Sequence, residues 1–434
     1  MLSEAESQLV LSCARQRLGP PAAARLGQAL AAPLRWDRII RIAARHGVAP
    51  LLHRHLGAPE LAEAVPTRAR RRLVELYLRG AHQTLHLLRA LGDLLARFRA
   101  GGLPVVVLKG GSLAQLLYHD ATLRPFGDLD VLIRKDDLER ARDVLFAAGY
   151  RFPPGLLPEG FIRQYHFNLP MVKQGAVQLC VELHWSLTDR FTGQTPDLDG
   201  LWARACSATL SGQETLILSP EDLISHLAVH LDMHGYLNRA VVGREDAVRF
   251  VFDPSSENRL IWFTDLYEAI TASGDRIDWA ALVDRGKRAG TSGAIGTSLA
   301  LLNALYGPVV EPRVLEWLGP PRLSLVKRGV FRWLASGMDR DGDPDSGSRG
   351  FFRSRVLPTR QAVQFRLIRL LDVWEYVLPP ADVVRRRYHV HRPWQVVFYL
   401  FHVANAFVHG GRIALALGWW LLKARMPRAT AETP

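Results

Sequence analysis

A change in hydrophobic spacing at residues 101–102 constrains the fold of this chain more than any other feature. From residue 66 to 99 leucines such as Leu73 and Leu91 recur at helical intervals. Two glycines end that helix, and a short valine-rich run over 103–108 follows. Because such a run suits a buried strand, a long helix must lead directly into a sheet.

The segments after this point alternate between strand and helix patterns. A second strand is expected over 126–133, an amphipathic helix over 136–148, and a hairpin from 169–173 and 177–187. Helical patterns fill residues 4–100 and resume after Pro220, which Ser219 precedes as an N-cap. The sequence therefore predicts an α+β fold, with a small mixed β-sheet core flanked by extensive helical regions.

The same patterns predict four parts of the chain. They are an N-terminal helical region over 1–100, a catalytic core over 101–210, a helical domain over 211–320, and a C-terminal helical region over 321–434. The last part contains a strongly apolar stretch, 394–422, interrupted by polar residues and glycines. We expect this stretch to form a core-packed or membrane-interfacial helical hairpin in preference to a membrane span.

Composition narrows the environment of the protein. Three widely spaced cysteines and no Cys-x-x-Cys pair favour neither a disulfide framework nor a thiolate zinc site. The first residues lack a basic segment followed by an apolar run, so we expect a cytoplasmic protein, with the inner face of the membrane as a site of peripheral contact. The net charge of +13 favours anionic partners, although a GC-rich genome would produce the same arginine-rich balance.

Two aspartates define the first candidate site. Asp128 and Asp130 lie two residues apart on an expected strand, so their carboxylates project from one face. Leu129, Val131 and Ile133 make that strand largely buried, which argues against a solvated pair. Neighbouring carboxylates repel each other, and a divalent cation such as Mg²⁺ relieves that repulsion.

A glycine turn precedes these aspartates. Gly110, Gly111 and Ser112 follow the valine-rich strand and begin a short helix, a place where backbone amides can hold phosphate. Lys109 and Arg124 add positive charge nearby. By itself such a turn is more often only a tight turn, and neither a P-loop nor a dinucleotide-binding glycine motif is present.

Glu182 is the best candidate for a third acid, because its strand neighbours are apolar and a charge there needs a partner. His184 lies on the same face, and a structural role is the favoured interpretation for it. Three more histidines, His226, His230 and His234, follow one another on a single helix face. Packing is favoured for this row over contact with the acids, and at most two neighbours could share a metal ion.

Together these segments resemble the bacterial uncharacterised nucleotidyltransferase family of the polymerase-beta-like superfamily. The resemblance is carried by the glycine turn at 108–112, the Asp-x-Asp strand at 124–133 and the Glu-Leu-His-Trp run at 182–185, and it extends over about 36–305.

By this resemblance Gly110, Gly111 and Ser112 would hold a triphosphate. Asp128, Asp130 and Glu182 would bind two metal ions, Mg²⁺ first and Mn²⁺ as the alternative, and Glu182 would help deprotonate the acceptor. The expected donor is a nucleoside triphosphate, with ATP favoured. The acceptor is a small molecule, saccharide or peptide, with RNA less favoured. The rival interpretation is a non-catalytic nucleotide-sensing or membrane-associated scaffold that retains the fold.

Overall fold

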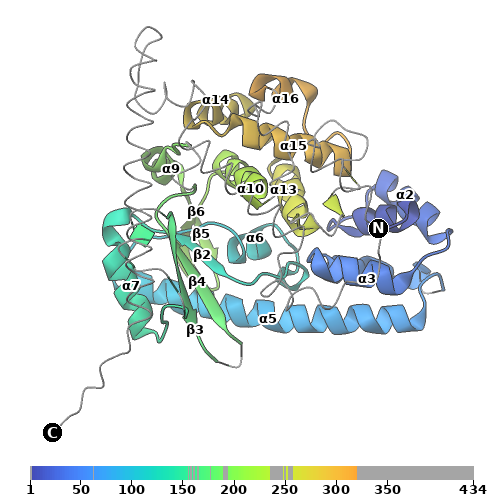
Figure 1. Cartoon of the computed structure of the whole chain (residues 1–434), viewed down its shortest axis with the longest axis horizontal. Coiled ribbons are helices and arrows are strands. Elements are labelled where there is room, and N and C mark those ends of the chain that lie inside the picture. Colours follow the sequence, from blue (N-terminus) through green and yellow to red (C-terminus); the bar gives the residue numbers. More distant parts are fainter. Residues whose placement is uncertain are drawn as a thin grey trace, which may run out of the picture.

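The computed structural model describes residues 2–319, apart from 62, 155, 157–158, 160–161, 164–165, 176, 189–193, 235–247, 249–250 and 253–257. Within these residues one mixed sheet is surrounded by helices (Figure 1). The α+β prediction is thus confirmed. The apolar stretch 394–422 lies outside the described residues. No helix of the described part is long and apolar enough to cross a lipid bilayer.

The sheet has six strands in the order β3-β4-β2-β1-β6-β5. Its strands are β1 (Val106–Val107), β2 (Leu129–Leu132), β3 (Asn168–Lys173), β4 (Leu179–His184), β5 (Cys206–Leu210) and β6 (Gln213–Ile217). β2 pairs in parallel with β4 and antiparallel with β1, and β1 pairs in parallel with β6. The predicted hairpin is confirmed as β3 and β4. The strand expected over 126–133 is shorter, so Asp128 immediately precedes it.

The hairpin of β5 and β6 is absent from the sequence prediction, and it extends the sheet past residue 210. Its strands carry serine, threonine, glutamine and glutamate and have no continuous apolar run. Ser211 and Gly212 form the turn with positive φ angles of 48° and 75°. This geometry suits the two-residue turn that joins twisted antiparallel strands.

Helices precede and follow the sheet along the chain. The N-terminal ones are α1 (Glu4–Cys13), α2 (Pro20–Leu30), α3 (Trp36–Arg45), α4 (Ala49–Leu56) and the 34-residue α5 (Thr67–Ala100). Between strands lie α6 (Gly111–Leu116), α7 (Leu138–Ala147) and α9 (Leu198–Arg204), and after them come α10 (Pro220–His234), α13 (Leu260–Ser273), α14 (Trp279–Ala289), α15 (Ser292–Tyr306) and α16 (Pro312–Leu318).

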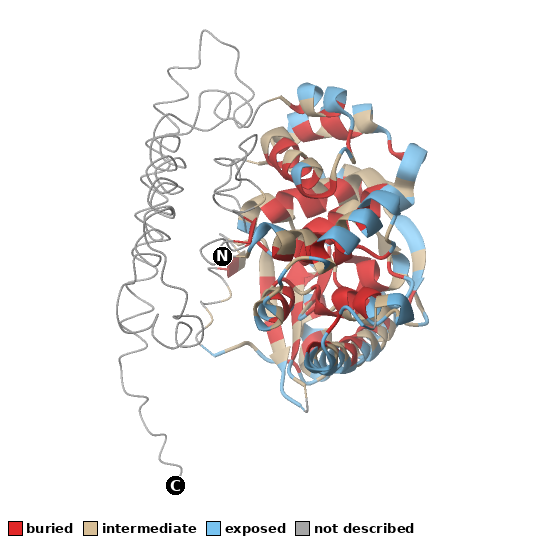
Figure 2. Ribbon diagram, turned by 90° about the vertical axis from the view of Figure 1, so that its right-hand side faces the viewer, coloured by how far each residue is buried: buried red, intermediate tan, exposed pale blue. Residues whose placement is uncertain are grey.

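Two large hydrophobic cores meet along α5. Its first turns, with Ala69 and Leu73, belong to a core that the N-terminal helices share with α10, α13 and α15. Its later turns, with Leu91 and Phe98, pack against one face of the sheet and α7. Figure 2 shows the buried residues concentrated in the interior of the described part. The four-part division of the chain stays a prediction, and the first and third predicted parts bury their apolar faces together.

Strand alternation gives the sheet two different faces. Leu129 and Val131 of β2, with Val181 and Leu183 of β4, pack into the core beneath α5 and α7. Successive strand residues point to opposite faces, so Asp130, Glu182 and His184 must project to the other side. The sheet thereby presents polar side chains on the face away from α5.

Candidate active site with a metal-binding cluster

Parallel pairing of β2 and β4 brings two of the predicted acids together. Asp130 is the direct register partner of Glu182, and His184 lies opposite Leu132 two pairs further along. The ligand atoms of Asp130, Glu182 and His184 all lie within 4.8 Å of one another. These three residues, which we call the triad, therefore form a group that could hold one metal ion.

His184 joins the two carboxylates. Its Nε2 lies 3.0 Å from Asp130 Oδ1 and 3.3 Å from Glu182 Oε2. Burial would lower the pKa of His184, but the hydrogen bonds to Asp130 and Glu182 raise it above its usual value. Among the described residues, Nδ1 of the same ring is buried and has no hydrogen-bond partner. A buried polar atom in this state is costly unless a ligand or water reaches it.

The other carboxylate oxygen of Asp130, Oδ2, is bonded to Lys109. The Lys109 ammonium lies 2.6 Å from Asp130 Oδ2, and the Asp130 side chain is fully buried. Burial would raise the pKa of Asp130, but Lys109 first and His184 second hold it well below its usual range. Asp130 is therefore ionised, and its Oδ1 stays directed at Nε2 of His184.

Glu182 is held by a residue that the sequence analysis missed. Asn168 of β3 donates its amide Nδ2 to Glu182 Oε2 at 2.6 Å. Burial would raise the pKa of Glu182, but the hydrogen bond from His184 lowers it below its usual value. Asn168 lies just before the expected hairpin strand 169–173. Its position in the sequence does not indicate a contact with Glu182, because the contact depends on the register of β3 against β4.

Asp128 stands at the margin of the triad. It is half-buried, and burial together with the negative charge of Asp130 raises its pKa. The thiol of Cys180 lies two residues before Glu182 on β4. Burial first, and then the negative charges of the nearby acids, raise its pKa to about 12. Three carboxylates thus share one region of low solvent access.

The glycine turn packs directly against the segment that leads into β2. Gly110 has a φ of 64°, and a Cβ there would lie 3.2 Å from the Asp128 carbonyl oxygen and 3.3 Å from the Phe126 ring. A Cβ on Gly111 would lie 2.7 Å from a methyl of Leu91. Both positions therefore need glycine for close packing. Ser112 is buried just after them, at the second residue of α6.

Arg124 lies in a different polar cluster. Its Nη2 is 2.6 Å from Asp265 Oδ2 on α13, and the two side chains are 6% and 1% exposed. Tyr118 donates its hydroxyl to Asp265 Oδ1 at 2.9 Å. We call Arg124, Asp265 and Tyr118 the buried ion-pair network. The guanidinium that the sequence analysis assigned to phosphate is thus bonded to a carboxylate.

Helix α10 adds histidines beside the acids. Burial first, and then the positive charges of Lys109 and His184, lower the pKa of His226 to about 3. Burial and then Lys109 also hold the pKa of His230 well below its usual value. His226 Nε2 is buried, and no residue of the described part forms a hydrogen bond with it. Two of the three predicted histidines are therefore neutral and within electrostatic reach of Lys109 and Asp130.

His230 and His234 form an aromatic group with Trp262 of α13. The ring centroids of His230 and Trp262 are 5.2 Å apart, and those of His234 and Trp262 are 5.0 Å apart. His230 and His234 therefore pack against Trp262, and packing is the role that the sequence favoured for this row of histidines.

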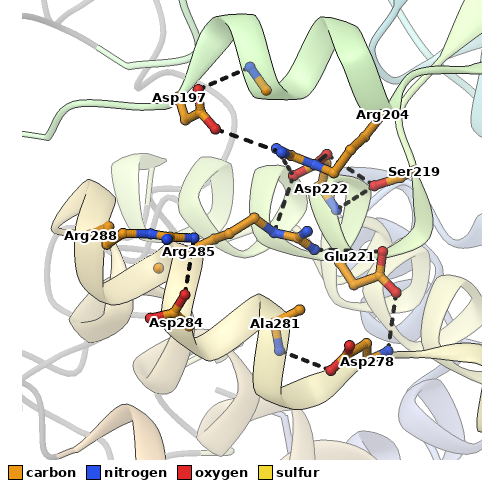
Figure 3. Close-up of polar contacts among 12 residues, drawn as sticks. Asp197, Arg204, Ser219, Glu221, Asp222, Asp278, Ala281, Asp284, Arg285 and Arg288 are labelled. Carbon is orange, nitrogen blue, oxygen red and sulfur yellow. Dashed lines mark hydrogen bonds and ion pairs between the residues drawn. The ribbon is translucent and has the colours of Figure 1, made fainter.

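The beginning of α10 is fixed by a charged network (Figure 3). Arg204, the last residue of α9, donates Nε to Asp222 Oδ2 at 2.9 Å, and Asp222 donates its backbone N–H to Ser219 Oγ at 3.3 Å. Arg285 of α14 lies 3.6 Å from Glu221 and 3.8 Å from Asp222. The predicted N-cap is confirmed, and the network fixes the helix that carries His226.

Comparison with known proteins agrees with this geometry. A family model described as uncharacterised nucleotidyltransferase matches residues 32–307. The match spans more than half of the chain, and the protein belongs to that family. Searches of curated proteins and of solved structures find no match.

Proposed function

We propose that this protein transfers a nucleoside monophosphate from a nucleoside triphosphate, with ATP favoured, to an acceptor hydroxyl and releases pyrophosphate. The observation that carries the proposal is the meeting of Asp130, Glu182 and His184 on two adjacent parallel strands, in a member of a nucleotidyltransferase family. Asp128 and the turn at Gly110 lie beside them.

The charges of the site fit a divalent ion. Asp128, Asp130 and Glu182 supply three negative charges, and Lys109 supplies one positive charge. With His184 neutral, as a metal ligand must be, two negative charges remain, and one divalent cation balances them. Bound divalent metal, with Mg²⁺ accompanying the triphosphate, would stabilise charge on the transferred phosphoryl group.

The remaining residues position the substrates in this proposal. Backbone amides of Gly110, Gly111 and Ser112 bind the triphosphate, and Lys109 contributes positive charge beside them. Since Arg124 is bonded to Asp265, the proposal gives it no direct phosphate contact.

In the transfer step the acceptor oxygen forms a bond to the α-phosphorus, and the bond from that phosphorus to the leaving pyrophosphate breaks. The proton of the acceptor hydroxyl passes to Glu182, whose lowered pKa keeps it ionised before the step. The acceptor is a small molecule, a saccharide or a peptide, with RNA less favoured.

The test is incubation of the full chain with labelled nucleoside triphosphate and Mg²⁺, with candidate acceptors of each class. Asp128→Asn and Glu182→Gln should abolish pyrophosphate release, while Asp136→Asn, a change at an exposed aspartate, should leave it unaltered. If wild type and both site variants show equal pyrophosphate release and equal metal-dependent nucleotide binding, the proposal is rejected in favour of a non-catalytic scaffold.

A further inference from the structure

The donor atoms of the triad are not all oxygen. Two carboxylate oxygens and one imidazole nitrogen, on Asp130, Glu182 and His184, come within 4.8 Å of one another. Mg²⁺ prefers sites made of oxygen ligands and water. Imidazole nitrogen suits Fe²⁺, Ni²⁺, Cu²⁺ and Zn²⁺ far better, and a nitrogen ligand therefore changes which ion a site favours. Mn²⁺ is the weakest binder of the first-row transition ions and the closest of them to Mg²⁺ in its ligand preference, so it gives the strictest comparison with Mg²⁺.

The nitrogen is at the centre of the group. His184 Nε2 is the atom that approaches both acids, at 3.0 Å from Asp130 Oδ1 and 3.3 Å from Glu182 Oε2. The His184 ring is buried and sits at a fixed position in the β4 ladder, opposite Leu132. An ion held by both carboxylate oxygens would therefore lie next to this nitrogen.

Neighbouring residues hold the acids and leave the donor atoms in place. Lys109 bonds Asp130 through Oδ2, so Oδ1 stays with the triad. Asn168 orients the Glu182 carboxylate from the adjacent strand. Such outer partners fix ligand geometry and raise metal affinity.

We propose that His184 is a metal ligand and that the triad selects a first-row transition-metal ion, of which Mn²⁺ is the simplest probe, over Mg²⁺. This inference rests on the proposed function, because it names the ion that binds at the same site. In it, the ion at the triad differs in kind from the Mg²⁺ that arrives with the triphosphate.

The first test measures metal binding to the full chain without nucleotide, by titration calorimetry with Mn²⁺ and with Mg²⁺. Wild type should bind Mn²⁺ at least about tenfold more tightly than Mg²⁺. In His184→Gln an amide replaces the imidazole, so Mn²⁺ affinity should fall at least about tenfold while Mg²⁺ affinity changes little. His119→Asn, at an exposed histidine bonded to Arg17, is the matched control and should keep the wild-type preference.

The second test detects the nitrogen directly. Pulsed electron paramagnetic resonance of the Mn²⁺-loaded protein should show coupling to a nitrogen nucleus, and ¹⁵N-labelled histidine should shift that coupling. This measurement needs no variant, so a folding defect in His184→Gln cannot obscure it. Absence of nitrogen coupling in wild type, equal affinity for the two ions, or coupling that survives His184→Gln would overturn the inference.

Failure of this inference is distinguishable from failure of the proposed function. Nucleotidyl transfer with Mg²⁺ and no nitrogen coupling would reject the ion assignment alone. Mn²⁺ binding through His184 without any transfer to the tested acceptors would support the ion assignment and reject the activity.

Discussion

The buried ion-pair network and the triad place similar charges at similar depth, and they differ in how completely those charges are matched. Arg124 and Asp265 bind each other through three hydrogen bonds, and Tyr118 adds a fourth. At the triad three acids lie near Lys109, and within the part of the chain that the structure describes Nδ1 of His184 has no hydrogen-bond partner. A matched cluster stabilises the fold, whereas an unmatched one retains the capacity to bind a ligand.

The largest expected effect comes from breaking the matched cluster. Asp265→Asn keeps the shape of the side chain but leaves the Arg124 charge buried without its partner, so the free energy of unfolding should fall by about 3–5 kcal/mol. Chemical denaturation measures this. The double variant Arg124→Met with Asp265→Leu should recover most of the loss, and a failure to recover would show that the charge is not the cause.

The equivalent change in the unmatched cluster should act on activity instead. Asp128→Asn should lower pyrophosphate release at least about 100-fold, a barrier increase of about 3 kcal/mol. Because burial and Asp130 disfavour the Asp128 carboxylate, its neutralisation should leave the melting temperature unchanged or raise it. A variant that loses activity and stability together would contradict the contrast between the clusters.

A smaller effect is expected at the edge of the matched cluster. Tyr118→Phe removes one hydrogen bond to the Asp265 carboxylate and should cost about 1.5–3 kcal/mol of unfolding free energy. Nucleotide binding should stay within twofold of wild type, as measured by titration calorimetry. A selective loss of binding without loss of stability would mean that the network serves the site directly.

Near neutral pH the smallest effect on stability is expected from a histidine in the shared helical core. Burial lowers the pKa of His46 to about 3, and its Nδ1 accepts a hydrogen bond from the backbone N–H of Leu260. The unfolded chain binds an extra proton below about pH 6.5, and the folded protein does not. Stability should therefore be complete above pH 6.5 and fall as pH drops from 6.5 toward 3, by up to about 1.4 kcal/mol per pH unit.

Urea denaturation of wild type and His46→Asn over this range is the measurement. The variant keeps an acceptor without a titrating ring, so its pH slope should be smaller by about one proton. An unchanged slope would assign the acid sensitivity to other groups, of which His226 is the first to examine.

Local patterns predicted the residues of the site better than their partners. Strand period alone placed Glu182 and His184 on one face, and the glycine turn was predicted from its position after a strand. The register of β2 against β4, which makes Asp130 the neighbour of Glu182, depends on long-range pairing that no short window contains.

The same reason explains the residues that were missed or differently placed. Arg124 was expected beside phosphate because its guanidinium adds positive charge near the glycine turn, but its partner Asp265 is 141 residues away. His184 was given a structural role because a buried histidine usually has one. Its value as a donor becomes apparent only when both acids surround it.

The core that the N-terminal helices share with α13 and α15 has a consequence for synthesis on the ribosome. Gln16 donates its backbone N–H to Glu268, and Tyr306 donates its hydroxyl to the carbonyl oxygen of Ala14, contacts that span 252 and 292 residues. Helices α1 to α4 leave the exit tunnel before their partners are made, so their apolar faces stay uncovered until the chain has grown past residue 306. A nascent chain of this protein is therefore an expected client of chaperones.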